Sequence, residues 1–207
     1  MLFFFFKIRC DSPLLSHLPN RILTMAQAAH TYNVNCPVPP DVSADNVINA
    51  LHFHENLLTL QPQMSSYSEI TSTEASDFDD YFDRLGSPVK VYEAIEKVTI
   101  LPGIGDCGKY PATVVVTFQN TADGLKSRAV APAGVVVTAT YSVKKLNRQD
   151  VIDHIDDDGG SVGDGNWILS QDVLLECPSW LMPFVRQNME AAQRHMCQNM
   201  VKIASLQ

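Results

Sequence analysis

Residues 181–205, LMPFVRQNMEAAQRHMCQNMVKIAS, decide how the rest of the chain is interpreted. The apolar residues of this stretch recur at spacings of four, four, three, four, four and three, which place them on one face of an α-helix. These residues are Leu181, Val185, Met189, Ala192, Met196, Met200 and Ile203. A helix of about 25 residues, rising about 1.5 Å per residue, spans roughly 37 Å and can cross a whole sheet.

Before this helix, strand patterns alternate with turn signals. Strands are expected at 31–38, around 67–71, and at 89–101, 112–119, 125–131, 135–143 and 166–176. Asp123-Gly124 tolerates positive φ and predicts a tight turn between the strands at 112–119 and 125–131. A helix is expected from Ser43, its N-cap, to Pro62.

This order predicts one α+β domain of the helix-grip kind, a curved antiparallel sheet wrapped around the long C-terminal helix, with short helices after the first strand. An apolar pocket is expected between the sheet and the C-terminal helix. Residues 1–30 are expected to be a disordered or misassigned extension and residues 31–207 the domain, with an acidic loop inserted at 150–165.

Composition narrows the classes of partner. The formal net charge of −8 over 207 residues disfavours nucleic acid and anionic lipid surfaces. The apolar run at 2–6 is far shorter than the roughly 20 residues of a membrane-spanning helix, so no integral membrane association is expected. Five scattered cysteines without a C-x-x-C pair favour a cytoplasmic protein. Mitochondrial targeting by residues 1–24 is the alternative.

No metal site and no cofactor are predicted. His52 and His54 are two residues apart, so on a helix they point in directions roughly 200° apart. The segment at 154–159, HIDDDG, approximates an EF-hand loop, but the twelfth position is Gly165, which has no carboxylate. PGIGDCG at 102–108 lacks the lysine of a phosphate-binding loop and is interpreted as a turn.

Three residues are candidates for catalysis. His195 lies beside Met196 near the edge of the apolar helix face, where an imidazole bordering a pocket could be a general acid or base. Tyr141 could donate a proton, and Arg128 could hold a carboxylate or an enolate oxygen. The alternatives are a boundary histidine, a core tyrosine with a satisfied hydroxyl and an outward-facing arginine.

The residues expected to line the pocket are apolar or aromatic. Methionine adapts its shape, so a methionine stripe on a helix over a cavity suits a bulky apolar ligand, although plain core packing gives the same pattern. The predicted lining consists of Val185, Met189, Met196, Met200, Tyr141 and Trp167.

Four motifs carry a resemblance to a known family. They are PGIG at 102–105, TFQNTADG at 117–124, APAGVVV at 131–137 and LMPFVR at 181–186. Through them the chain resembles an uncharacterised fungal family within the START-like superfamily, also called SRPBCC or polyketide-cyclase-like. The resemblance implies the helix-grip fold, but the superfamily includes lipid-transfer modules, hormone receptors, cyclases and chaperone-binding domains.

Three functional hypotheses follow. The first is binding of a small hydrophobic molecule, such as a lipid, sterol or polyketide, in the apolar cavity. The second is a cofactor-independent cyclase or isomerase of fungal secondary metabolism, in which the cavity folds a reactive substrate. The third is a protein-interaction domain that works through a helix face or through the acidic loop.

Overall fold

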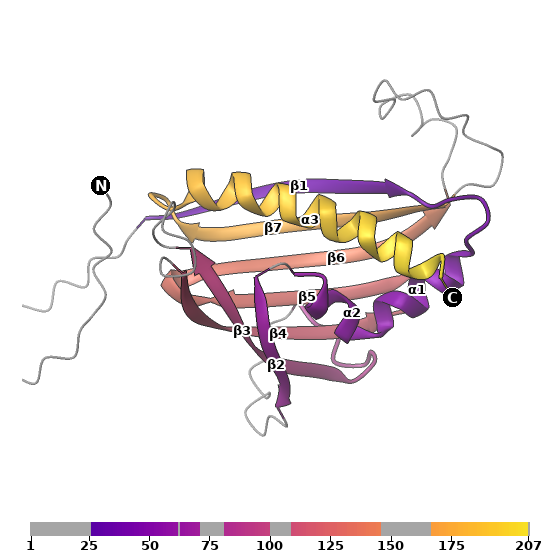
Figure 1. Cartoon of the computed structure of the whole chain (residues 1–207), viewed down its shortest axis with the longest axis horizontal. Helices are drawn as coiled ribbons and strands as arrows, with labels where there is room; N and C mark the ends of the chain where they lie inside the picture. The colour runs from indigo at the N-terminus through magenta and orange to yellow at the C-terminus, as the bar shows by residue number, and fades with distance from the viewer. Residues whose placement is uncertain (1–25, 62, 71–80, 100–108, 146–166, 207) are drawn as a thin grey trace, which may run out of the picture.

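The computed structural model describes residues 26–61, 63–70, 81–99, 109–145 and 167–206 (Figure 1). Within these residues seven strands form one antiparallel sheet in the order β1-β7-β6-β5-β4-β3-β2. The strands are β1 (Gln27–Pro37), β2 (Met64–Ile70), β3 (Val89–Thr99), β4 (Lys109–Thr121), β5 (Gly124–Ala131), β6 (Val135–Lys145) and β7 (Trp167–Pro178). Each predicted strand is present, and the helix-grip prediction is confirmed.

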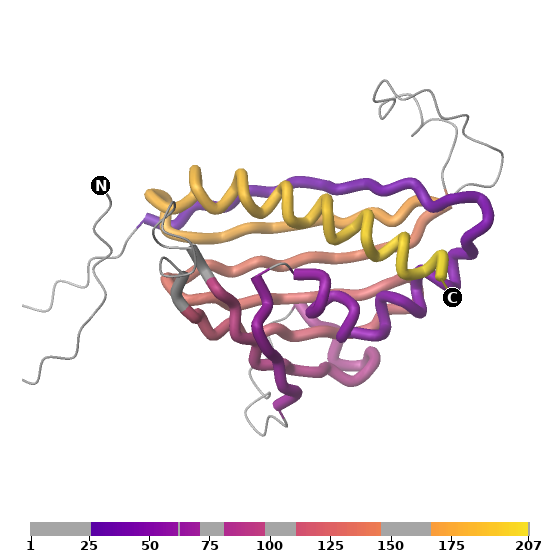
Figure 2. The backbone as a smooth tube through the Cα atoms, viewed as in Figure 1, coloured from indigo at the N-terminus to yellow at the C-terminus, as the bar shows by residue number. Residues whose placement is uncertain are grey.

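The three helices lie on the concave side of the curved sheet. They are α1 (Ala44–His52), α2 (His54–Thr59) and α3 (Met182–Ala204). Figure 2 shows the backbone of α3 running along the sheet from the β1 and β7 edge toward α1. No helix in the described part of the chain is both long and apolar enough to cross a membrane. Of the N-terminal extension predicted at 1–30, residues 1–25 fall outside the described residues, whereas Gln27, Ala28, Ala29 and His30 belong to β1. The acidic loop and the 102–105 turn also fall outside the described residues.

The helix expected between Ser43 and Pro62 is divided in two. Ser43 caps α1 as predicted, because its side-chain oxygen accepts a hydrogen bond from the backbone N–H of Asn46 at 3.1 Å. Phe53 then leaves the helical region, with φ −82° and ψ 84°. This break lets both flanking histidines reach the sheet, which their two-residue spacing would prevent on one regular helix.

Both predicted turns around β5 are present. In the Asp123-Gly124 turn a side chain at Gly124 would collide with the backbone carbonyl of Tyr141 on β6, so the close approach of the strands requires glycine. A short 3-10 turn, Pro132–Gly134, joins β5 to β6, and Ala133 takes a positive φ of 63° there. These two turns fix the register of β4, β5 and β6.

The C-terminal helix begins at Met182, shortly after β7 ends at Pro178. Its buried residues are Gln193, Met196, Cys197, Met200, Val201 and Ala204. Burial of Met196 and Met200 agrees with the predicted apolar face. The other predicted positions nearer the N-terminus of the helix, Val185, Met189 and Ala192, are only half-buried. The two halves of α3 therefore pack differently on the sheet.

Candidate functional site

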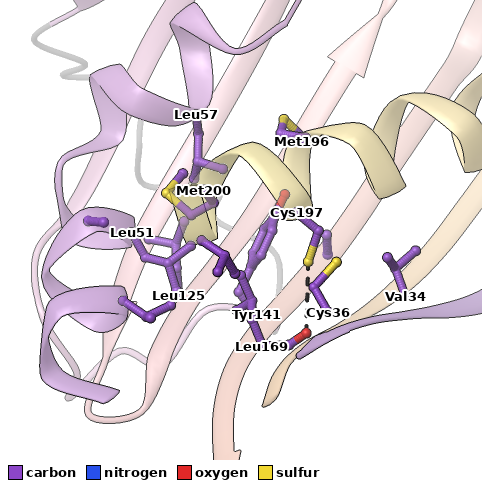
Figure 3. Packing of buried hydrophobic residues seen from close by; sticks show 14 of the residues in the cluster. Val34, Cys36, Leu51, Leu57, Leu125, Tyr141, Leu169, Met196, Cys197 and Met200 are labelled. Carbon is purple, nitrogen blue, oxygen red and sulfur yellow. Dashed lines mark hydrogen bonds between the residues drawn. The ribbon is translucent and has the colours of Figure 1, made fainter. Parts of the chain in front are cut away.

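The C-terminal half of α3 closes a filled core. Figure 3 shows Met200 packed among Leu51 and Leu57 of the short helices and Leu125 and Tyr141 of the sheet. Leu51, Leu125 and Met200 are each 1 % exposed or less. At this end of the domain the described core side chains are shielded from solvent.

On the central strands the concave face is apolar but incompletely covered. Three small apolar residues of the central strands β5 and β6 lie there half-buried, and we call them the open floor. They are Ala129, Ala131 and Val137. Val185 and Met189 of α3 are also half-buried. Side chains in the middle of a sheet under a helix are normally among the most buried, so the open floor marks a gap in the packing.

A polar cluster separates the open floor from the filled core. It consists of Tyr32 of β1, Tyr141 of β6, Gln171 of β7 and Gln193 of α3. Gln171 donates a hydrogen bond through Nε2 to Oε1 of Gln193, and the Tyr141 hydroxyl lies 3.5 Å from the same oxygen. Tyr141 pairs with Gln171 directly across β6 and β7. The sheet register and one helix residue thus assemble this cluster.

Two atoms of the polar cluster have no hydrogen-bond partner. They are the hydroxyl oxygen of Tyr32 and Oε1 of Gln171, and both are inaccessible to solvent. Burial raises the pKa of the Tyr32 hydroxyl above its ordinary value, and the negative charge of Glu190 adds to this effect. Burial likewise raises the pKa of the Tyr141 hydroxyl. Both tyrosines therefore stay protonated and can act as hydrogen-bond donors.

An ion pair ties β1 to α3 beside this cluster. Nε2 of His30 donates to Oε1 of Glu190 at 2.8 Å, and Nε of Arg186 donates to the same oxygen at 3.0 Å. The hydrogen bond from His30, followed by that from Arg186, lowers the pKa of the Glu190 carboxyl. The His30 ring also stacks on Tyr32, with ring centroids 5.5 Å apart.

Cys36 of β1 and Cys197 of α3 meet at the filled end, and both are free thiols. Sγ of Cys197 donates to the backbone carbonyl of Leu169 at 3.8 Å. Contact with Cys36 and burial raise the pKa of the Cys197 thiol, so it is a protonated packing residue rather than a nucleophile.

The structure places two of the predicted catalytic residues away from the concave interior. His195 is exposed on the outer side of α3, where its Nε2 accepts a hydrogen bond from Nδ2 of Asn199 at 2.8 Å. The reason is helical phase, since a residue next to Met196 is rotated by about 100° from the buried face. Arg128 alternates with the inward-facing Ala129 and lies on the convex side of β5, opposite Thr138. Neither residue borders the concave interior.

The other predicted residues lie on the concave side at different depths. Tyr141 is 3 % exposed and belongs to the polar cluster. Met196 and Met200 are part of the filled core. Val185 and Met189 face the half-open end, and Trp167 is half-buried against the edge of the core at the start of β7.

The helix histidines are structural. Nε2 of His52 donates to the carbonyl of Gly124 at 2.9 Å. His54 is buried, with Nε2 donating to Oδ1 of Asn120 at 2.8 Å and Nδ1 3.3 Å from the Tyr92 hydroxyl. Burial lowers the pKa of His54 and raises that of Tyr92 to about 12. Among the described residues no three histidine, cysteine or acidic side chains are grouped as a metal would require.

One carboxyl group on the concave side was not singled out from the sequence. Glu96 of β3 has the same strand parity as the buried Tyr92 and Ala94, and it is half-buried opposite Ala112. Burial raises the pKa of its carboxyl. A charged residue within a strand is usually taken as outward-facing, so only the sheet parity identifies it.

A separate groove of about 510 Å³ lies on the opposite, convex face of the sheet. It is lined by Thr31, Tyr32 and Asn33 of β1, by Thr138 and Thr140 of β6, and by Asp172, Val173 and Leu174 of β7. Tyr81 completes the lining, and its hydroxyl lies 2.9 Å from both the Ala139 carbonyl and Oγ1 of Thr140. Because Asp172 and Thr140 point away from α3, this groove is not the pocket predicted between sheet and helix.

The polar cluster was largely missed from the sequence. Of its four members only Tyr141 was a candidate. Gln171 shares the strand parity of Leu169 and Val173, and Gln193 lies three residues before Met196. A glutamine at an otherwise apolar strand position was the available signal for this site.

Fold and interior together define a helix-grip protein, in which a curved sheet closes on a C-terminal helix over an apolar interior. The chain belongs to the family described as a domain of unknown function (DUF7053), whose model matches residues 27–206. No curated protein shows significant sequence similarity to the chain.

Several solved structures are similar at low identity. Ara h 8.0201 is 12% identical, with a TM-score of 0.47, over 84% of this chain and 99% of that one. The di-domain ARO/CYC StfQ of the steffimycin biosynthetic pathway is 8% identical, with a TM-score of 0.46, over 86% of this chain and 50% of that one. An uncharacterized protein from Rhizobium leguminosarum is 7% identical, with a TM-score of 0.45, over 86% and 98% respectively.

Proposed function

We propose that the protein binds a small hydrophobic molecule, of lipid, sterol or polyketide type, between the open floor and the N-terminal half of α3. The observation that carries this proposal is the contrast within one helix. The half that contains Met196 and Met200 is packed in the core, whereas Val185 and Met189 in the other half stay half-buried, as do the open-floor residues of β5 and β6.

The chemistry of this surface favours an apolar ligand. The open floor consists of alanine and valine side chains, and methionine above it can repack around ligands of different shape. Removing such a surface from water is favourable by about 25 cal/mol per Å². The described residues of the concave interior place few ionisable groups there, so binding is expected to rest on burial of apolar area.

Native mass spectrometry of the purified protein, and titration with a neutral fluorescent probe such as N-phenyl-1-naphthylamine, test the proposal. Met189→Trp should fill the space and reduce probe uptake at least tenfold. Gln198→Trp is the matched control, since Gln198 is exposed on the same helix. Protein that takes up neither the probe nor any of a panel of fatty acids, phospholipids and sterols contradicts the proposal.

A second candidate function is a cofactor-independent cyclase or isomerase, and Glu96 is the observation that favours it. A half-buried carboxyl on the concave side, whose pKa is raised by burial, is a candidate for general acid or base catalysis. Deuterium exchange at the α-carbon of a bound cyclic ketone, 2-tetralone, tests this activity. Exchange that the protein accelerates and that Glu96→Gln abolishes, while probe binding is retained, supports the enzyme; unaccelerated exchange contradicts it.

The class of partner and the cellular location of the protein remain predictions from its sequence. We infer that the protein works without nucleic acid, because its formal charge is −8, and in the cytoplasm, because its five scattered cysteines lack a C-x-x-C pair. A protein-interaction role through the acidic loop concerns residues outside the described part of the chain.

A further inference from the structure

We propose that the polar cluster is an anchor for a neutral ligand that carries a hydroxyl group, which accepts a hydrogen bond from Tyr32 and donates one to Gln171. This inference rests on the proposed function and specifies the class of ligand. The apolar body of the ligand lies over the open floor, and its hydroxyl group points toward the filled core.

The first argument is the lack of partners at two buried atoms. Gln171 is 0 % exposed, yet its Oε1 accepts no hydrogen bond, and the Tyr32 hydroxyl is equally inaccessible and unpartnered. Buried polar side-chain atoms are paired in the large majority of cases, because an unpaired one costs about 1–3 kcal/mol. Two such atoms side by side indicate a missing partner.

The second argument is that the two atoms are neighbours. Tyr32 pairs with Val173, and Gln171 is two residues from Val173 on the same strand and the same face. The two side chains are therefore diagonal neighbours across β1 and β7. Tyr32 also influences the pKa of Tyr141, which lies directly opposite Gln171. The two unpartnered atoms therefore belong to neighbouring positions on one face of the sheet.

The third argument is the hydrogen-bonding direction of each atom. Nε2 of Gln171 already donates to Gln193, so its remaining Oε1 can only accept, whereas the Tyr32 hydroxyl can donate. An alcohol or phenol both accepts and donates, so it satisfies both atoms. A carbonyl or ether accepts only and leaves Oε1 of Gln171 unpaired.

The fourth argument excludes an anion. A carboxylate would lose its hydration and find a single donor, Tyr32, beside a carbonyl oxygen that repels it. Glu190 adds a negative charge near Tyr32. Its partners His30 and Arg186 are already engaged with that carboxylate, so they do not serve as an anion site. The cluster therefore selects hydroxylated neutral molecules over fatty acids.

The experiment compares three probes of nearly one shape: 2-naphthol, 2-methylnaphthalene and 2-naphthoate. Each displaces N-phenyl-1-naphthylamine from the full chain at pH 7. We expect 2-naphthol to bind about tenfold more tightly than 2-methylnaphthalene, the factor for one net neutral hydrogen bond, and 2-naphthoate to bind more weakly than both. Tyr32→Phe should abolish the preference for 2-naphthol without changing the affinity for 2-methylnaphthalene.

Tyr81→Phe is the matched control, because Tyr81 lies on the convex face and its loss should leave the preference intact. Tyr32→Phe should keep the melting temperature or raise it, since the hydroxyl that it removes is unpartnered. Equal binding of 2-naphthol and 2-methylnaphthalene, or a preference that survives in Tyr32→Phe, overturns the anchor and leaves the proposed function standing. Failure of every probe, N-phenyl-1-naphthylamine included, overturns both.

Discussion

Gln171 of β7 and Gln193 of α3 join the sheet to the C-terminal helix through a side-chain hydrogen bond inside the core. Gln193 is the first fully buried residue along α3, and beyond it the helix is packed tightly on the sheet. Before it, the helix residues Val185, Met189 and Ala192 are only half-buried. The pair therefore stands at the boundary between the solid part of the domain and the part that we propose to hold the ligand.

Replacing only one of these two glutamines should destabilise the fold more than replacing both. Gln193→Leu leaves Nε2 of Gln171 buried without an acceptor, and we expect it to lower the free energy of unfolding by about 1–3 kcal/mol. The double variant Gln171→Leu, Gln193→Leu removes both partners and should lose less than the sum of the single changes. Urea denaturation measures all three variants. Losses that simply add would show that the two amides are not coupled.

The two halves of α3 should respond differently to the same truncation. Met200 is 1 % exposed in the filled core, so Met200→Ala should cost about 2–5 kcal/mol. Met189 is half-buried beside the open floor, so Met189→Ala should cost less than about 1 kcal/mol. Denaturant titration compares them under the same conditions. Equal losses would mean that the domain is packed uniformly along the helix.

Glu96 should make the protein less stable as the pH rises. Burial raises the pKa of its carboxyl in the folded state above 4.5, so the folded state holds the proton more tightly than the unfolded state does. The resulting stabilisation is present below pH 4.5 and is lost as the pH rises through the folded pKa. Glu96→Gln should therefore be more stable than the wild type at pH 7 and equal to it near pH 4. Melting temperatures of both proteins between pH 4 and pH 8 test this. A melting temperature of the wild type that rises relative to that of the variant as the pH increases contradicts it.

His54 should make the protein less stable as the pH falls. Burial lowers its pKa in the folded state below 6.5, so the unfolded state binds the proton more tightly. Its contribution to stability is complete above pH 6.5 and is lost as the pH falls through the folded pKa. His54→Gln keeps a hydrogen-bonding side chain toward Asn120 and should flatten the pH dependence between pH 6.5 and pH 5. His52→Gln serves as the control, and an equal flattening there would contradict the assignment to His54.

Local patterns were sufficient for the elements and their order. Alternation from Val135 to Val143 predicted β6, and the turn residues on either side of β5 predicted the hairpins that set its register. The break at Phe53 was not predicted, because it depends on His52 and His54 reaching β4 and β5, which are distant in the sequence. His195 was expected near the edge of the apolar face of α3 and is exposed, because one residue along a helix corresponds to a rotation of about 100° from the buried Met196.

The sequence by itself determined that this chain forms an antiparallel sheet closed by a long amphipathic helix, because the periods of two and 3.6 residues are local properties that hydrophobic burial acts on directly. Only the tertiary structure decided where the interior is filled and where it is open, since this depends on how far α3 extends over each strand. It also decided that Tyr32, Tyr141, Gln171 and Gln193 form one cluster. These residues come from four elements. Their polar side chains come together only when the register of three strands and the phase of one helix are fixed.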